Sequence, residues 1–203
     1  MNSSRDTILG KLRQQLPQEV QLPDLSDDWT EYPDPLSQFS SVLEMVGGRC
    51  VAVETLADVG QHIAQEPLWA NAKVQASLVN GVGDSTLDLA SIADPHALQD
   101  VDFALLPAFL AVAENAAVWV DDTALKHRVL YFITQHLALV VPRSGLVHNM
   151  HQAYDRIDVT RRPFGAFISG PSKTADIEQS LVIGAHGARS LTVFLVNDWS
   201  GPL

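Results

Sequence analysis

The chain has 203 residues, of which 46% are hydrophobic and 18% are charged, a balance typical of one folded domain with an appendage rather than a disordered segment. Its formal net charge is −11, and no run of lysine and arginine offsets this charge locally, so nucleic acid is excluded as an expected partner. The single cysteine, Cys50, excludes an internal disulfide and an iron–sulfur cluster held by this chain alone, because such a cluster needs about four thiolates.

Residues 1–35 differ in pattern from the rest of the chain and are expected to lie outside the main domain. Residues 3–16 repeat apolar side chains at helical spacing behind a serine cap, which predicts an amphipathic helix with a narrow apolar face. Residues 17–35 combine acidic residues with several prolines, which predicts an extended arm. We expect the helix to dock loosely or to pack on a partner, and a homo-oligomer is one such arrangement.

Residues 36–203 alternate between short apolar runs and helical patterns. The apolar runs predict strands over residues 50–53, 74–79, 101–106, 116–120, 137–141, 164–169 and 191–196. The helical patterns, the first of which begins at Pro35, cover residues 35–45, 56–65, 123–135 and 144–157. Strands that are apolar throughout and are separated by helices are typical of a sheet covered on both faces. The sequence therefore predicts a three-layer α/β/α sandwich with a mostly parallel sheet.

Membrane insertion is not expected from the distribution of apolar residues. No charge-free apolar run approaches the ~20 residues that a membrane span needs. The N-terminal segment also lacks the continuous apolar core of a secretory signal. We therefore expect a cytoplasmic protein that does not act at a membrane.

The turn at residues 170–178 follows an expected strand, and ligands of open α/β sheets bind outside the carboxyl ends of the strands. We expect this turn, Glu114 and His186 to form one cluster at that edge. Gly170 and Pro171 favour a sharp turn, and a helix expected to begin near Ala175 would direct free N–H groups at the loop. Ser172 and Thr174 add hydroxyl groups. The segment thus predicts a binding site for a small anionic or carbonyl group. The alternative is a connection whose Ser172, Thr174 and Asp176 only cap a helix.

Glu114 is the candidate catalytic residue. It stands in an otherwise apolar stretch just before the expected strand at residues 116–120, and burial would favour its protonated form and suit it to act as a general acid, base or nucleophile. The alternative is a carboxylate that faces solvent or caps a loop. His186 lies between glycines, where it either approaches a ligand closely or serves as an ordinary turn residue. The full set of candidate ligand-binding residues is Gly170, Pro171, Ser172, Thr174, Asp176, Glu178, His186 and Gly187.

No metal or organic cofactor is expected. His148, His151 and Asp155 share one face of the expected helix at residues 144–157, a spacing compatible with a metal site, but chance spacing is the favoured interpretation. The chain also lacks a P-loop, a Gly-x-Gly-x-x-Gly helix opening and a Gly-x-Ser-x-Gly motif. Cys50 is expected to be a buried strand residue rather than a nucleophile.

Residues 113–196 resemble the lactate-utilisation members of the LUD-domain family. The resemblance rests on Ala-Glu-Asn-Ala-Ala-Val-Trp-Val at residues 113–120, on Leu-Ala-Leu-Val-Val-Pro at residues 137–142, and above all on Phe-Ile-Ser-Gly-Pro-Ser-Lys-Thr-Ala-Asp-Ile-Glu at residues 167–178. His186-Gly187 and a closing strand follow in the family's order. One departure stands out: the family pattern Glu-x-Gly-Ser/Thr is replaced by Glu114-Asn115-Ala116-Ala117.

The resemblance implies a fold like that of the sugar-phosphate isomerase and CoA-transferase group. It further implies a role in bacterial L-lactate oxidation to pyruvate, as a non-redox component beside partner subunits that carry iron–sulfur clusters. Two other functions stay open. One is an independent enzyme that uses Glu114 on a phosphorylated, CoA-linked or hydroxy-acid substrate, and the other is a module that only binds a metabolite.

Overall fold

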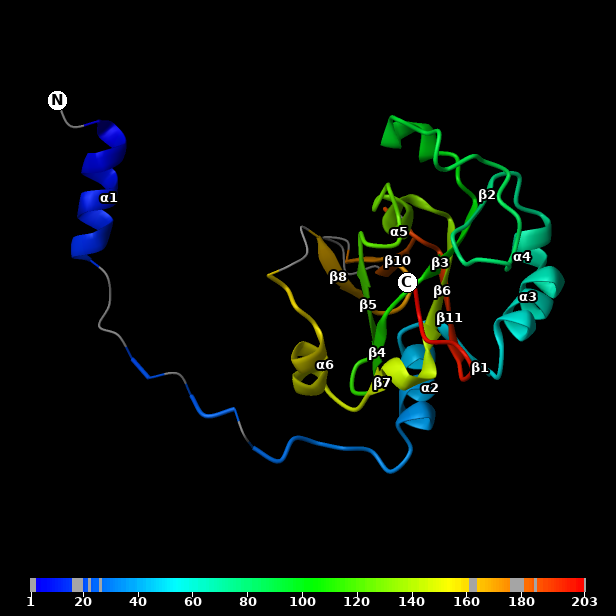
Figure 1. Cartoon of the computed structure of the whole chain (residues 1–203), viewed down its shortest axis with the longest axis horizontal. Coiled ribbons are helices and arrows are strands. Elements are labelled where there is room, and N and C mark those ends of the chain that lie inside the picture. The colour runs from blue at the N-terminus through cyan, green and yellow to red at the C-terminus, as the bar shows by residue number, and fades with distance from the viewer. Residues whose placement is uncertain are drawn as a thin grey trace.

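The computed structural model describes residues 3–15, 20, 21, 23–25, 27–160, 164–175, 181–184 and 186–202 (Figure 1). The α-helices are α1 (Ser4–Gln14), α2 (Pro35–Met45), α3 (Leu56–Gln65), α4 (Pro67–Ala70), α5 (Leu130–Ile133) and α6 (Met150–Arg156). The strands are β1 (Arg49–Val53), β2 (Gln75–Ser77), β3 (Phe103–Pro107), β4 (Leu110–Val112), β5 (Ala117–Asp121), β6 (His136–Pro142), β7 (Leu146–Val147), β8 (Gly165–Ile168), β9 (Lys173–Ala175), β10 (Leu181–Ile183) and β11 (Ser190–Val196). Short 3₁₀ turns cover Pro95–Leu98 and Arg143–Gly145.

A parallel five-stranded sheet forms the centre of the protein, in the order β1-β11-β6-β3-β2. Its middle strand, β6, pairs with β11 from His136 to Pro142 and with β3 from His136 to Val140. The α/β fold with a mostly parallel sheet is thus confirmed. Five of the seven expected strands belong to this sheet.

The other two expected strands, at residues 116–120 and 164–169, lie in a second sheet of order β7-β4-β5-β8. There β5 pairs antiparallel with both β4 and β8, whereas the sequence interpretation placed both strands in one largely parallel sheet. An apolar run fits any buried strand, so its composition does not reveal which sheet it joins.

Alternating side chains of the parallel sheet divide the core into two layers. On one face, Ala138 and Val140 of β6 pack with Val59 and Ile63 of α3 and with Trp69 of α4. On the other face, a larger cluster combines residues of β6 and β11 with α2, α5 and the second sheet. Its largest fully buried members include Phe39, Leu43, Leu130, Tyr131, Leu137, Leu139, Leu191 and Leu195.

Helices that carry their own start signals form where the sequence predicts them. Thr55 caps α3 through a capping box with Asp58, and the Asp34 carboxylate accepts the N–H groups of Leu36 and Ser37 at the start of α2. The predicted bounds of these two helices, residues 56–65 and 35–45, match the structure.

Two expected helices are wrong over part of their length. Residues 123–129 are not helical, because Lys126 Nζ donates to the Ala90 carbonyl at 3.0 Å and His127 Nε2 lies 2.8 Å from the Ile92 carbonyl. The expected helix at residues 144–157 begins only at Met150, because Leu146–Val147 pairs with β4 instead. In both cases contacts with distant residues override the local helical pattern.

The N-terminal arm lies along α6, whereas α1 stands clear of the domain (Figure 1). The Trp29 ring stacks on the His151 imidazole with centroids 3.5 Å apart, and the Tyr32 N–H donates to His148 Nδ1 at 2.9 Å. The α1 helix is capped by Ser3 and contains no buried residue. Among the described helices, none combines the length and the hydropathy that a membrane span requires.

Leu139→Ala should lower the free energy of unfolding by about 2–5 kcal/mol, because the side chain is fully buried in the middle of β6 and its removal leaves a cavity. Leu68→Ala is the matched control: Leu68 is 43% exposed, and the change should stay within about 0.5 kcal/mol. Urea titration of both variants measures the difference. Equal losses of unfolding free energy in the two variants would show that Leu139 of β6 is not a central part of the core.

Candidate functional site

A cavity of about 320 Å³ brings together four of the candidate ligand-binding residues. They are Gly170 and Ser172 from one turn and His186 and Gly187 from the other. We call it the amino-edge cavity, because Leu137 and Leu191 at its base stand at the beginning of β6 and β11. The complete lining is Tyr131, Phe132, Leu137, Phe167, Ile168, Gly170, Ser172, Lys173, His186, Gly187, Ala188 and Leu191.

This location corrects the expectation that the cluster lies at the carboxyl edge of the parallel sheet. The turn that holds His186 and Gly187 leads into β11 and therefore lies at its amino end. The segment at residues 170–172 follows β8, which is a strand of the second sheet and not of the parallel one. The rule that ligands bind at carboxyl ends therefore does not apply to this turn.

Backbone hydrogen bonds fix the two turns against each other. The Ser172 N–H donates to the Ala188 carbonyl at 2.8 Å, and the Gly184 N–H donates to the Ser172 carbonyl at 2.9 Å. Pro171 is buried, and its ring lies 3.5 Å from the position that a Cβ on Gly47 would occupy. The floor of the cavity is therefore preformed.

The residues at which the expected helix would begin are in a different conformation, and residues 176–180 lie outside the described residues. Lys173–Ala175 is instead strand β9, which pairs antiparallel with β10 and so places Thr174 opposite Val182. The backbone groups of Lys173–Ala175 serve the ladder between β9 and β10, so these described residues do not provide the predicted helix N-terminus. Asp176 and Glu178 lie outside the described residues.

The polar groups of the cavity are cationic or hydrogen-bond donors, and its walls are apolar. Lys173 and His186 are exposed at the cavity, and Ser172 is half-buried. Lys173 Nζ lies 3.5 Å from the Pro171 carbonyl oxygen, so the ammonium group stands over the turn. An ammonium, an imidazole and a hydroxyl beside apolar walls suit a small organic anion.

Lys173 was missing from the candidate residues chosen from the sequence, although it lies inside the motif at residues 170–178. A signal was available, because Lys173 is the one cationic side chain in that motif. The expected helix drew attention to backbone N–H groups as the anion-binding feature and away from this side chain.

Glu114 is not among the residues that line the cavity. It is exposed at the tip of the β4–β5 hairpin, and its Oε2 accepts the Met150 N–H at 3.0 Å at the start of α6. The Glu114 N–H donates to the His148 carbonyl at 3.0 Å. This geometry matches the alternative of a solvent-facing carboxylate that caps a neighbouring element.

The same hairpin shows what the departure from the family pattern costs. Ala116, at the position where the resemblance led us to expect glycine, has a φ of 53° and is fully buried. It is the one non-glycine residue with positive φ among the described residues. Left-handed backbone at alanine costs roughly 1–2 kcal/mol, and the remainder of the hairpin supports that strain.

The metal interpretation of His148, His151 and Asp155 finds no support in the described part of the chain, where no cluster of three potential ligands occurs. His148 precedes α6 and accepts a backbone N–H, while His151 stacks on Trp29. Burial, and secondarily the Glu44 carboxylate, raise the pKa of the Cys50 thiol to about 11, which leaves little thiolate near neutral pH.

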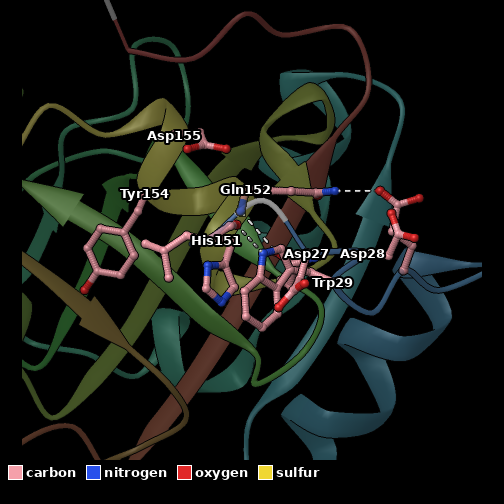
Figure 2. A pocket seen from close by; sticks show the side chains of 10 residues that line it. Asp27, Asp28, Trp29, His151, Gln152, Tyr154 and Asp155 are labelled. Atoms are coloured by element: carbon pink, nitrogen blue, oxygen red, sulfur yellow. Dashed lines mark hydrogen bonds between the residues drawn. The ribbon is translucent and has the colours of Figure 1, made fainter. Parts of the chain in front are cut away.

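A larger cavity of about 820 Å³ lies between the N-terminal arm and α6 (Figure 2). We call it the arm groove. It contains none of the candidate residues from the motif at residues 170–178, and four of its ten lining side chains are carboxylates, with no lysine or arginine among them. Its lining is Leu25, Asp27, Asp28, Trp29, Glu31, Asn149, His151, Gln152, Tyr154 and Asp155.

Fold and site together define an α/β protein with a central parallel sheet and a small cation-bearing cavity at its amino edge. A solved structure, a DUF162 family protein from Deinococcus radiodurans, has the same fold, with a TM-score of 0.58 and 19% identity over 80% of this chain and 96% of that one. The sequence profile of the LUD domain matches residues 84–196, more than half of the chain, and the chain belongs to this family. The resemblance inferred from the sequence is confirmed.

Several curated relatives are named Lactate utilization protein C. Lactate utilization protein C of Exiguobacterium sp. is 25% identical over 97% of this chain and 97% of its own length. Proteins of the same name from Shouchella clausii and Bacillus velezensis are each 34% identical, over 44% of this chain and 41% and 39% of their own lengths. These latter alignments cover less than half of either partner.

Gly170→Ala should destabilise the protein more than Gly81→Ala. Both glycines have positive φ (+72° and +76°), so alanine at either position costs roughly 1–2 kcal/mol of left-handed strain. At Gly170 a Cβ would also lie 2.7 Å from the Val46 carbonyl oxygen, whereas nothing lies within 4 Å at Gly81. Overpacking should add about 1–3 kcal/mol. Urea titration measures the loss of unfolding free energy in both variants. Equal losses would contradict the close packing of this turn against Val46.

The stability of the protein should fall as pH drops below neutrality, in part through His136. Burial, and next the nearby Arg189, lower the pKa of His136 despite the opposing charges of Asp102 and Glu66. A histidine with a lowered folded-state pKa stabilises fully above its unfolded pKa of about 6.5, and this contribution is lost as pH falls toward the folded value.

His136→Asn should therefore reduce the slope of unfolding free energy against pH between about pH 7 and pH 5. His96→Asn is the control, since the His96 side chain is 90% exposed. Urea titrations at a series of pH values measure the slope. An unchanged slope in His136→Asn would show that this histidine does not carry the effect.

Proposed function

We propose that this chain is a non-redox component of a bacterial L-lactate utilisation system, which oxidises L-lactate to pyruvate. The observation that carries the proposal is the alignment with Lactate utilization protein C of Exiguobacterium sp., which extends over 97% of both chains. Membership of the LUD-domain family supports the same role.

The amino-edge cavity is the proposed ligand site, and a small carboxylate is the proposed ligand. Its volume of about 320 Å³ lies at the lower end of the range for ligand pockets, which suits a molecule of a few carbon atoms. The Lys173 ammonium would pair with a carboxylate, since charge-assisted hydrogen bonds are stronger than neutral ones. Ser172 and His186 would bond a hydroxyl or keto oxygen next to it.

Partner subunits with iron–sulfur clusters are part of the proposal. A single cysteine cannot hold a cluster alone, and Cys50 is half-buried in β1. Electron transfer in lactate oxidation would then take place in the partners, and this chain would bind a reactant or a product. No chemical step is assigned to this chain.

A second candidate is a binding module or enzyme for phosphorylated or CoA-linked metabolites. The observation that favours it is the exposure of Lys173 and His186, which leaves the cationic side of the cavity open to a ligand larger than lactate. An exposed lysine binds a phosphate group as readily as it binds a carboxylate. The two candidates differ in which ligands bind.

Deletion of the gene in its native host should abolish or strongly slow growth on L-lactate while growth on pyruvate continues. Affinity purification of the full chain from that host should recover cluster-bearing proteins, visible by their iron content and visible absorbance. Normal growth of the deletion strain on L-lactate, together with recovery of the chain alone, would contradict the proposed role.

Lys173→Met should weaken binding of L-lactate or pyruvate at least tenfold, because loss of a charge-assisted hydrogen bond costs about 1.5–3 kcal/mol. Lys73→Met is the matched control, since Lys73 is exposed and does not line the cavity. Isothermal titration calorimetry of the purified chain provides the affinities. Binding of sugar phosphates or CoA esters without binding of either carboxylate would favour the second candidate.

A further inference from the structure

The N-terminal helix α1 presents an apolar face that the described domain does not cover. Ile8 and Leu12, one turn apart on the same face, are 59% and 57% exposed. Three cationic side chains and one carboxylate give α1 a formal charge of +2 within a chain of −11. Lys11 and Arg13 lie in its last turn. The helix is therefore a basic, amphipathic element on an acidic protein.

The arm groove has the opposite character. Its carboxylates belong to Asp27, Asp28, Glu31 and Asp155, and within the described residues no lysine or arginine forms an ion pair with any of them. Figure 2 shows Asp155 on α6 and Asp27 and Asp28 on the arm, near the stacked rings of Trp29 and His151.

Apolar surface is also exposed at the groove. Leu25 is 63% exposed, Tyr154 is 55% exposed and Trp29 is 39% exposed, and all three line the cavity. A helix with an apolar stripe flanked by cations is the complement of such a surface, because it buries the apolar atoms and neutralises the carboxylates at the rim.

Contacts of the arm with α6 and the residues before it fix the shape of the groove. The Asn149 Nδ2 donates to the Thr30 carbonyl at 3.0 Å, and the Gln152 Nε2 donates to Glu31 Oε1 at 2.8 Å. The Trp29–His151 stack and the bond from the Tyr32 N–H to His148 add to them. A groove formed before binding costs little ordering free energy when a partner enters it.

We propose that the arm groove of one copy receives α1 of a second copy, in a reciprocal exchange that forms a two-fold dimer. Ile8 and Leu12 pack against the apolar side chains of the groove, and Lys11 and Arg13 face its carboxylates. The second copy is the occupant because α1 lies apart from the groove of its own chain (Figure 1). Reciprocal exchange fills both grooves and closes the assembly.

Charge exchange tests this proposal on the full chain. Wild type should sediment as a concentration-dependent dimer. Lys11→Glu with Arg13→Glu should raise the dimer dissociation constant at least tenfold, because like charges then meet across the interface. Asp27→Lys with Asp28→Lys should have the same effect, and combining all four changes should restore the dimer. Lys73→Glu with Arg143→Glu, both at exposed positions outside the groove, is the control for charge alone.

Leu12→Asp removes the apolar contact without altering the groove and should also give monomers, with circular dichroism showing that the domain stays folded. A wild-type chain that is monomeric at every concentration overturns the dimer. A monomer whose α1 amides are protected from hydrogen exchange would show docking within one chain. If the variant that combines all four charge changes fails to form a dimer, the arm groove is not the acceptor of α1. None of these outcomes depends on lactate binding.

Discussion

The pairing of β6 with a neighbour on each side is the constraint on which the rest of the structure depends. Because β6 bonds to β11 and β3 from His136 onward, the amino ends of three strands meet at one edge. The Arg189 N–H then donates to the Gln135 carbonyl at 2.8 Å, which fixes the turn before β11. The same turn binds Ser172, because the Ala188 carbonyl accepts the Ser172 N–H. The register of the strands therefore sets the position of the cavity.

How far the sequence predicts the structure depends on the range of the interactions involved. Helices α2 and α3 are predictable because Asp34 and Thr55 cap them locally. The segments at residues 123–129 and 146–147 are not, because bonds to residues far away in sequence decide their conformation. The candidate cluster shows the same division: the motif and His186 do meet, but the edge at which they meet depends on the direction of β8.

Two residues near the tip of the β4–β5 hairpin show that likeness to the expected family pattern does not decide a residue's local role. Glu114 matches the family pattern, yet its carboxylate accepts a backbone N–H of α6 at an exposed position. Ala116 departs from the pattern and still adopts the left-handed conformation that suits glycine. The turn thus adopts this backbone shape at an energetic cost, and Glu114 beside it binds the start of α6.

The start of α6 supports more than the arm. His148 accepts the Tyr32 N–H through its ring and the Glu114 N–H through its carbonyl, so one residue bridges the arm and the hairpin tip. At that tip the Asn115 carbonyl accepts the Ser169 hydroxyl at 2.8 Å, one residue before Gly170. The arm is therefore a buttress for the cavity: it contacts His148, His148 holds the hairpin tip, and the tip binds the residue that precedes Gly170.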